Sequence, residues 1–128
     1  MRRSIILGLA TAALLAGPAL AASFRVSTEV SADQAGKCAA AAVVMQNVVK
    51  VMAKTDEDRE LLVATEAMTE GWRVYIQGKD PAYRSAAQAS LTRATDAYAD
   101  GLQGSEPKAV LEAALAEHAK CLGWMAES

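Results

Sequence analysis

The sequence predicts an all-α protein, an antiparallel up-and-down bundle of four helices in which one disulfide bond joins the first helix to the last. Three observations favour this fold. Alanine, which has the strongest intrinsic helix preference, accounts for 29 of the 128 residues. Apolar residues recur at steps of three and four along most of the chain, as they do on one face of a helix. Three prolines and eight glycines are too few for a chain dominated by loops and turns.

The first 21 residues have the composition of a secretory signal peptide. Arg2 and Arg3 give a positive start, an apolar run follows, and Ala19 and Ala21 supply the small residues that signal peptidase recognises. The run is shorter than the ~20 residues that cross a membrane, and a retained N-terminal anchor is the alternative. We expect residues 1–21 to be cleaved after Sec-type export to the periplasm or exterior of a bacterial cell, which leaves no membrane span.

The charge balance argues against a surface for polyanions. The full chain has 13 basic and 15 acidic residues, which gives a net charge of −2 and a pI of about 5.4. Loss of Arg2 and Arg3 with the signal peptide leaves 11 basic residues against 15 acidic ones, a net charge of −4. We therefore expect no nucleic-acid binding.

The rest of the chain divides into a short arm and one helical domain. Residues 22–30 have no helical period and are predicted to be extended, whereas residues 31–128 are predicted to form the bundle. The four apolar patterns place helices at about 32–54, 56–77, 81–102 and 106–123. Because the turns between them are short, consecutive helices should be antiparallel neighbours.

Capping residues mark the start of each predicted helix. Gln34 follows Ser31, the predicted cap of the first helix, by three residues and completes a capping box. Val30 is placed to pack against Ala35. Pro81 suits the first position of the third helix because its missing N–H would have no partner there. The predicted N-caps are Ser31, Thr55, Asp80 and Ser105.

Cys38 and Cys121 are the only cysteines, and in an exported protein we expect them to form a disulfide bond. The start of the first helix and the end of the last meet at the same pole of an up-and-down bundle, so the bond and the topology support each other. Two free buried thiols are the alternative. The separation of the cysteines rules out a CxxC redox motif, and no CxxCH motif is present for covalent haem.

The residue inventory argues against an enzyme. The chain has a single histidine, so an HExxH motif or a three-histidine zinc site is impossible. It has no GxSxG motif and no glycine-rich phosphate loop. We therefore expect no catalytic residues, no metal site and no cofactor.

His118 lies in the middle of the apolar face of the predicted fourth helix. The simplest interpretation is a core histidine whose ring nitrogens find partners inside the bundle. Antiparallel counting places four residues with polar tips at a similar height, which together with His118 form a candidate buried polar or ligand site: Trp72, Tyr75, Tyr83 and Ser90. A pH sensor is a further interpretation, because histidine titrates near neutral pH.

The first helix has an unusually broad apolar face, which covers roughly half of its circumference instead of the ~100° stripe of an ordinary surface helix. Such a helix is either central to the core or shared with a partner. We predict a non-enzymatic exported protein that binds another protein or itself. The alternative is a carrier of a small ligand, metal or haem in a pocket around His118. The predicted partner face consists of Ala41, Val44, Met45, Val48 and Met52.

Overall fold

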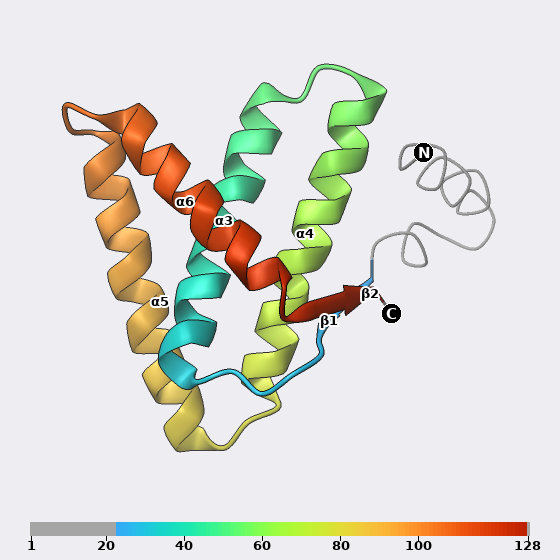
Figure 1. Cartoon of the computed structure of the whole chain (residues 1–128), viewed down its shortest axis with the longest axis vertical. Coiled ribbons are helices and arrows are strands. Elements are labelled where there is room, and N and C mark those ends of the chain that lie inside the picture. The colour runs from blue at the N-terminus through green and yellow to red at the C-terminus, as the bar shows by residue number, and fades with distance from the viewer. Residues whose placement is uncertain (1–22, 128) are drawn as a thin grey trace.

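The structure, a computed structural model, describes residues 23–127 (Figure 1). The predicted signal peptide lies outside these residues. The four predicted helices are present, and each of their ends lies within two residues of its predicted position. In chain order the elements are β1 (Phe24–Val26), α3 (Ala32–Met52), α4 (Asp56–Gln77), α5 (Pro81–Leu102), α6 (Pro107–Leu122) and β2 (Met125–Glu127).

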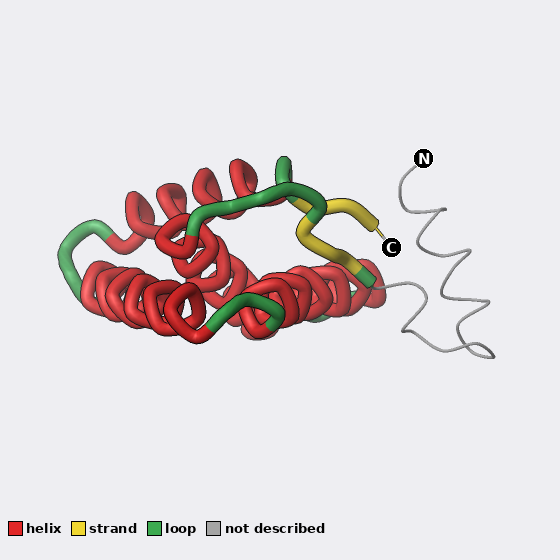
Figure 2. Tube along the Cα trace, turned by 90° about the horizontal axis from the view of Figure 1, so that it is seen from below, coloured by secondary structure: helices red, strands yellow, loops and turns green. Residues whose placement is uncertain are grey.

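Helix α3 occupies the centre of the bundle and contacts the other three helices. Helices α4 and α5 flank it, and α6 crosses the face of this layer against α3 and α5 (Figures 1 and 2). Successive helices run in opposite directions along the chain, as predicted, with the connecting turns at alternate ends (Figure 1). The expectation that all consecutive helices are neighbours is wrong for α4 and α5, because α3 lies between them. As a result α3 packs against α5, which runs in the same direction.

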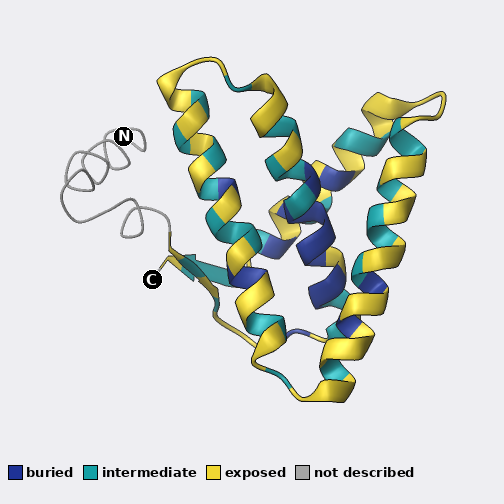
Figure 3. Ribbon diagram, turned by 180° about the vertical axis from the view of Figure 1, so that it is seen from behind, coloured by how far each residue is buried: buried dark blue, intermediate teal, exposed yellow. Residues whose placement is uncertain are grey.

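The buried core surrounds the N-terminal half of α3, where small side chains allow the helices to approach closely. Ala35 and the alanines at 39–42 are buried there, and the buried residues of α3 gather in this half of the helix (Figure 3). Gly36 faces α5 directly, since a Cβ at this position would lie 2.7 Å from Ser90 Cβ and 2.8 Å from the Leu91 nitrogen. Only glycine fits this contact between two helix backbones.

Three of the four predicted N-caps are confirmed, and the fourth is wrong. The side chains of Ser31, Thr55 and Asp80 accept hydrogen bonds from backbone N–H groups in the first turns of α3, α4 and α5. Helix α6 instead begins at Pro107 after Glu106, which makes no side-chain cap. Proline fixes the backbone of the first helical position, so the residue directly before it, and not Ser105, becomes the cap.

The predicted capping box at the start of α3 forms only in part. The Ser31 hydroxyl accepts from the Gln34 backbone nitrogen at 3.2 Å. The Gln34 side chain, however, donates to Glu117 Oε2 on α6 at 2.6 Å. A contact between two helices has therefore replaced the local reciprocal hydrogen bond that the sequence pattern predicted.

Part of the N-terminal arm is a strand whose partner the sequence did not reveal. Strand β1 pairs antiparallel with β2, with Phe24 opposite Glu127 and Val26 opposite Met125. The two described ends of the chain therefore lie side by side, next to α4 (Figure 1). Gly71 of α4 leaves the space in which the Phe24 carbonyl and the Met125 side chain pack.

Candidate functional site

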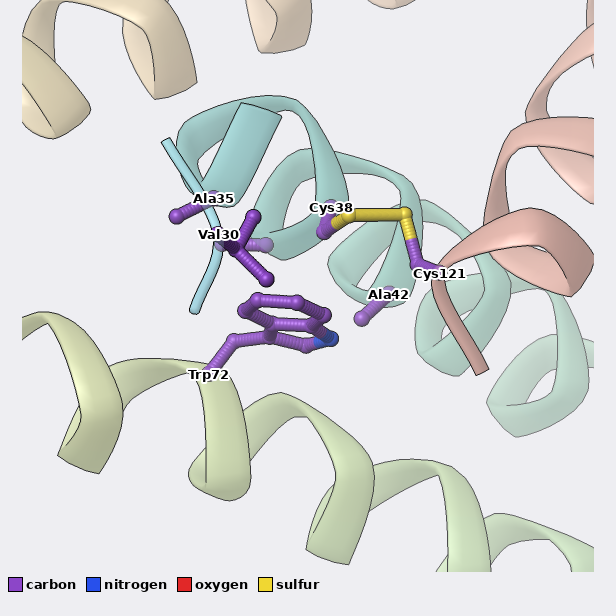
Figure 4. Close-up of a cluster of buried hydrophobic side chains, with 7 residues drawn as sticks. Val30, Ala35, Cys38, Ala42, Trp72 and Cys121 are labelled. Carbon is purple, nitrogen blue, oxygen red and sulfur yellow. A yellow bond between two sulfur atoms is a disulfide. The ribbon is translucent and has the colours of Figure 1, made fainter. Parts of the chain in front are cut away.

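The predicted disulfide bond is present and completely buried. Cys38 of α3 and Cys121 of α6 are joined with their Cα atoms 5.6 Å apart, which ties the first helix to the last. The indole of Trp72 and the side chain of Val30 pack beside the bond (Figure 4). The Glu117 carboxylate lies within 4.8 Å of both sulfur atoms, but sulfurs joined in a disulfide are not thiolate ligands for a metal.

His118 is buried, as predicted, with only 6% of the residue exposed. Burial lowers the pKa of its imidazole, because the charged ring would lose its hydration. Its Nδ1 atom has no hydrogen-bond partner among the described residues, and neither has Nε1 of the buried Trp72. Burial therefore favours the neutral form of the ring.

The hydroxyl groups expected to surround His118 are engaged elsewhere. Tyr83 donates to the Val30 carbonyl at 2.6 Å, and the Val30 nitrogen donates to the Tyr75 hydroxyl at 3.0 Å. The Ser90 hydroxyl donates to the Asp33 carbonyl at 2.8 Å. The expectation that one of these groups would partner the ring is wrong, because they tie down the arm and the first turn of α3. A ligand pocket around His118 stays a prediction.

A charged group that the sequence analysis missed completes the attachment of the arm. Lys79 Nζ lies 3.0 Å from Glu29 Oε2 and 4.5 Å from the centre of the Tyr75 ring. The ammonium hydrogen bond to Glu29 lowers the pKa of that carboxyl, and burial raises the pKa of Tyr83. Together these contacts hold residues 29 and 30 against α4 and α5.

The predicted partner face of α3 divides into two parts. Ala41 and Val44 are buried in the core, and Met45 and Val48 are half-buried. Met52, in the last turn, is 64% exposed. The first part of this face is thus the centre of the bundle, whereas its last turn is left exposed by the other elements within residues 23–127.

Three large apolar side chains are exposed where α3 ends and α4 begins, and we call this surface the open end. It consists of Val51, Met52 and Leu61, which are 82%, 64% and 51% exposed. Leu61 precedes Trp72 by eleven residues, or about three helical turns, so both lie on the α3-facing side of α4. Its exposure shows that α3 no longer covers α4 at this end.

Beside the open end lies a cavity of about 440 Å³ between three helices, which we call the α3–α5–α6 groove. None of the residues that line it is charged. Val51 and Met52 belong both to the open end and to the wall of the groove. Its larger apolar side chains are Val44, Val48, Val51 and Met52 from α3, Leu102 from α5 and Leu111 from α6.

Comparisons of the chain with protein-family models, with curated proteins and with solved structures found no match. Within residues 23–127, no helix combines the length and apolar character required to cross a membrane. The hydroxyls of Tyr75, Tyr83 and Ser90 are engaged in structure, whereas the open end exposes large apolar side chains.

Proposed function

We propose that the protein is exported, is not an enzyme, and acts by binding another protein through the open end of its bundle. The exposure of Val51, Met52 and Leu61 carries this proposal. Single exposed apolar residues are ordinary on protein surfaces, but neighbouring large ones are typical of interaction sites. Leu61 is the most telling of the three, because it lies on the core-facing side of its helix.

Export is supported by two independent features. Residues 1–21 have the charge and apolar pattern of a signal peptide. The bond between Cys38 and Cys121 is of a kind that persists in oxidising compartments and is rare in the cytosol. A disulfide that joins the first and last helices also suits a small domain with a modest core.

The contacts of the polar side chains favour binding over catalysis. The hydroxyls of Tyr83 and Ser90 are held by backbone carbonyls, and the imidazole of His118 is buried with no hydrogen-bond partner at Nδ1 among the described residues. A nucleophile needs a base within hydrogen-bond reach. Binding needs only exposed apolar area, which the open end provides.

The shape of the open end suggests what the partner contributes. Its side chains come from the last turn of α3 and the second turn of α4. Apolar grooves between helices commonly accept one face of an amphipathic helix. We therefore expect a partner helix that buries a leucine-like residue against Leu61 and Met52.

A pair of matched substitutions tests the proposal. Leu61→Glu adds a carboxylate at the open end, and Leu115→Glu makes the same change on α6, where the leucine is exposed to the same degree (51% and 53%). The partner is captured from periplasmic extract with the wild-type protein, identified by mass spectrometry, purified and titrated by calorimetry.

We expect Leu61→Glu to weaken binding of that partner at least about tenfold, the loss of ~1.4 kcal/mol, and Leu115→Glu to leave it unchanged. Circular dichroism confirms that both variants are folded. Equal affinities for the wild type and Leu61→Glu would contradict the proposal, and so would a wild-type protein that captures no partner.

A further inference from the structure

We propose that the α3–α5–α6 groove is a second binding site, for a small neutral amphiphile with an apolar chain and an uncharged hydrogen-bonding head. This goes beyond the proposed function, because the ligand is a small molecule and the residues that recognise its head lie away from the open end. The proposal depends on the size of the groove, on the neutrality of its walls, and on three polar side chains within it.

The size and walls of the groove define the apolar part of the ligand. Its volume of about 440 Å³ falls within the ~300–1,000 Å³ of small-molecule sites. Aliphatic side chains such as Val48, Leu102 and Leu111 line it on three helices. Since no charged residue lines the groove, a charged head would find no ionic partner in its walls. The ligand that fits is therefore neutral.

Three uncharged polar side chains within the groove define the head. Asn47 comes from α3, and Thr95 and Tyr98 come from α5. None of the three forms a side-chain hydrogen bond to another residue in the described part of the chain. Asn47 is exposed, and Thr95 and Tyr98 are half-buried, so all three line the groove where it meets solvent. A few polar groups that fix the orientation of the ligand are typical of ligand sites in otherwise apolar pockets.

The register of α3 and α5 brings two of these groups together. Gly36 packs against Ala87, Ser90 and Leu91, so residues in the two parallel helices meet at an offset of about 51–55. The same offset places Asn47 opposite Tyr98. An amide offers both donors and an acceptor, and a phenol offers one donor.

The surroundings of Tyr98 keep its hydroxyl protonated, so that it can donate a hydrogen bond. Burial, and then the negative charge of Glu117, raise the pKa of Tyr98, so the phenol stays protonated at ordinary pH. A hydroxyl or carbonyl head between Asn47 and Tyr98 would complete the hydrogen bonds that the protein leaves open. Its chain would then lie along the valines of α3 toward Leu102.

The experiment uses the mature protein and N-phenyl-1-naphthylamine, a neutral apolar dye whose fluorescence rises in apolar sites. Two competitors have the same twelve-carbon chain: 1-monolauroylglycerol, with a neutral head, and ionised laurate, both below their micellar concentrations. We expect saturable binding of one dye per chain, with displacement by the glyceride at a concentration at least tenfold below that of laurate.

Two variants inside the groove and one outside it separate this proposal from its alternatives. Ala99→Trp fills the groove from an exposed position and should abolish dye binding. Tyr98→Phe removes one hydroxyl and should weaken the glyceride about fivefold, as expected for one hydrogen bond, while the dye binds unchanged. Leu61→Glu, at the open end, should alter neither ligand.

Three results would overturn the proposal: dye binding that survives Ala99→Trp, laurate that competes as well as the glyceride, or a glyceride affinity that Tyr98→Phe leaves unchanged. The last result would mean an apolar hollow that recognises no head. Failure of the proposed function is visible separately, because it appears as loss of the Leu61→Glu effect on the partner protein and leaves the dye titration unaffected.

Discussion

Leu61 and Trp72 lie on the same face of α4, eleven residues apart, yet Trp72 is completely buried and 51% of Leu61 is exposed. The difference arises because other described parts of the chain cover α4 around Trp72 but not around Leu61. Around Trp72 the disulfide bond, the N-terminal arm and the first half of α3 pack together (Figure 4). Around Leu61, α3 is reaching its last turn at Met52. The bundle is thus closed at one end and open at the other.

The disulfide bond should supply much of the stability of the closed end. Replacing both cysteines, Cys38→Ala together with Cys121→Ala, is expected to lower the free energy of unfolding by about 4–5 kcal/mol, because the bond closes a loop of some eighty residues. The residues it joins are 83 apart in the sequence. Urea denaturation followed by circular dichroism measures the change. A loss below about 1 kcal/mol would show that the unfolded chain gains little freedom when the bond is removed.

The hydrogen bond between Tyr83 and the arm gives a second prediction. Tyr83→Phe removes the donor to the Val30 carbonyl and should lower the free energy of unfolding by about 1 kcal/mol. Tyr98→Phe is the matched control, because the Tyr98 hydroxyl has no partner among the described residues, and it should change stability by less than about 0.5 kcal/mol. Equal effects of the two variants in thermal or urea unfolding would contradict the role of Tyr83.

The close contact of α3 with α5 predicts that Gly36 cannot be enlarged. Gly36→Ala places a methyl group against Ser90 and Leu91 and should cost about 1–3 kcal/mol of stability. Gly78→Ala is the control, since its backbone has the ordinary right-handed conformation and an added Cβ would have only van der Waals contacts. That change should stay within about 0.5 kcal/mol. Comparable losses for both variants in urea unfolding would show that α3 can move away from α5.

The burial of His118 predicts a pH dependence of stability. Its pKa in the folded protein lies below the ~6.5 of the unfolded chain, so the folded state binds fewer protons between the two values. The contribution of the neutral ring is therefore complete above the unfolded pKa and is lost as the pH falls toward the folded one. The neighbouring Glu117 does not reverse this sign, because its carboxylate accepts from Gln34 and pairs with Lys120.

Urea denaturation of the wild type and of His118→Gln between about pH 4.5 and 7.5 tests this dependence, because that range includes the pKa of an unperturbed histidine. The stability difference between wild type and variant should shrink as the pH falls. Carboxylates titrate in both proteins, and the comparison removes their contribution. Parallel pH profiles would mean that the ring keeps an ordinary pKa.

The four helices could be predicted because their signals are local. Thr55 with its acidic first turn, and Asp80 before Pro81, mark helix starts within a few residues. The β1–β2 ribbon could not be predicted in this way. Its strands have three residues each and pair across about a hundred residues of chain, so neither carries a pattern of its own. The start of α6 was misplaced because Pro107 overrides the cap preference of Ser105.

The candidate site was predictable in composition but not in arrangement. The apolar stripe of the fourth helix correctly predicted that His118 is buried. Residue counting along antiparallel helices predicts which residues lie at the same level of the bundle, but not the direction in which each side chain points. The hydroxyls of Tyr75 and Tyr83 point toward the N-terminal arm. The broad apolar face of α3 was equally visible in the sequence. Its division into core and open end depends on where α6 crosses α3, which no local pattern contains.

The most direct test of the open end as a binding surface is photo-crosslinking from a single position. A benzophenone amino acid is introduced at Leu61 in one form of the protein and at Leu115 in another, and whole cells that produce each form are irradiated. The two leucines are exposed to a similar degree, so accidental encounters should label both equally. We predict a covalent adduct of one discrete size, containing a second protein, from position 61 and none from position 115. Adducts of equal yield from both positions, or none from position 61, would contradict the account.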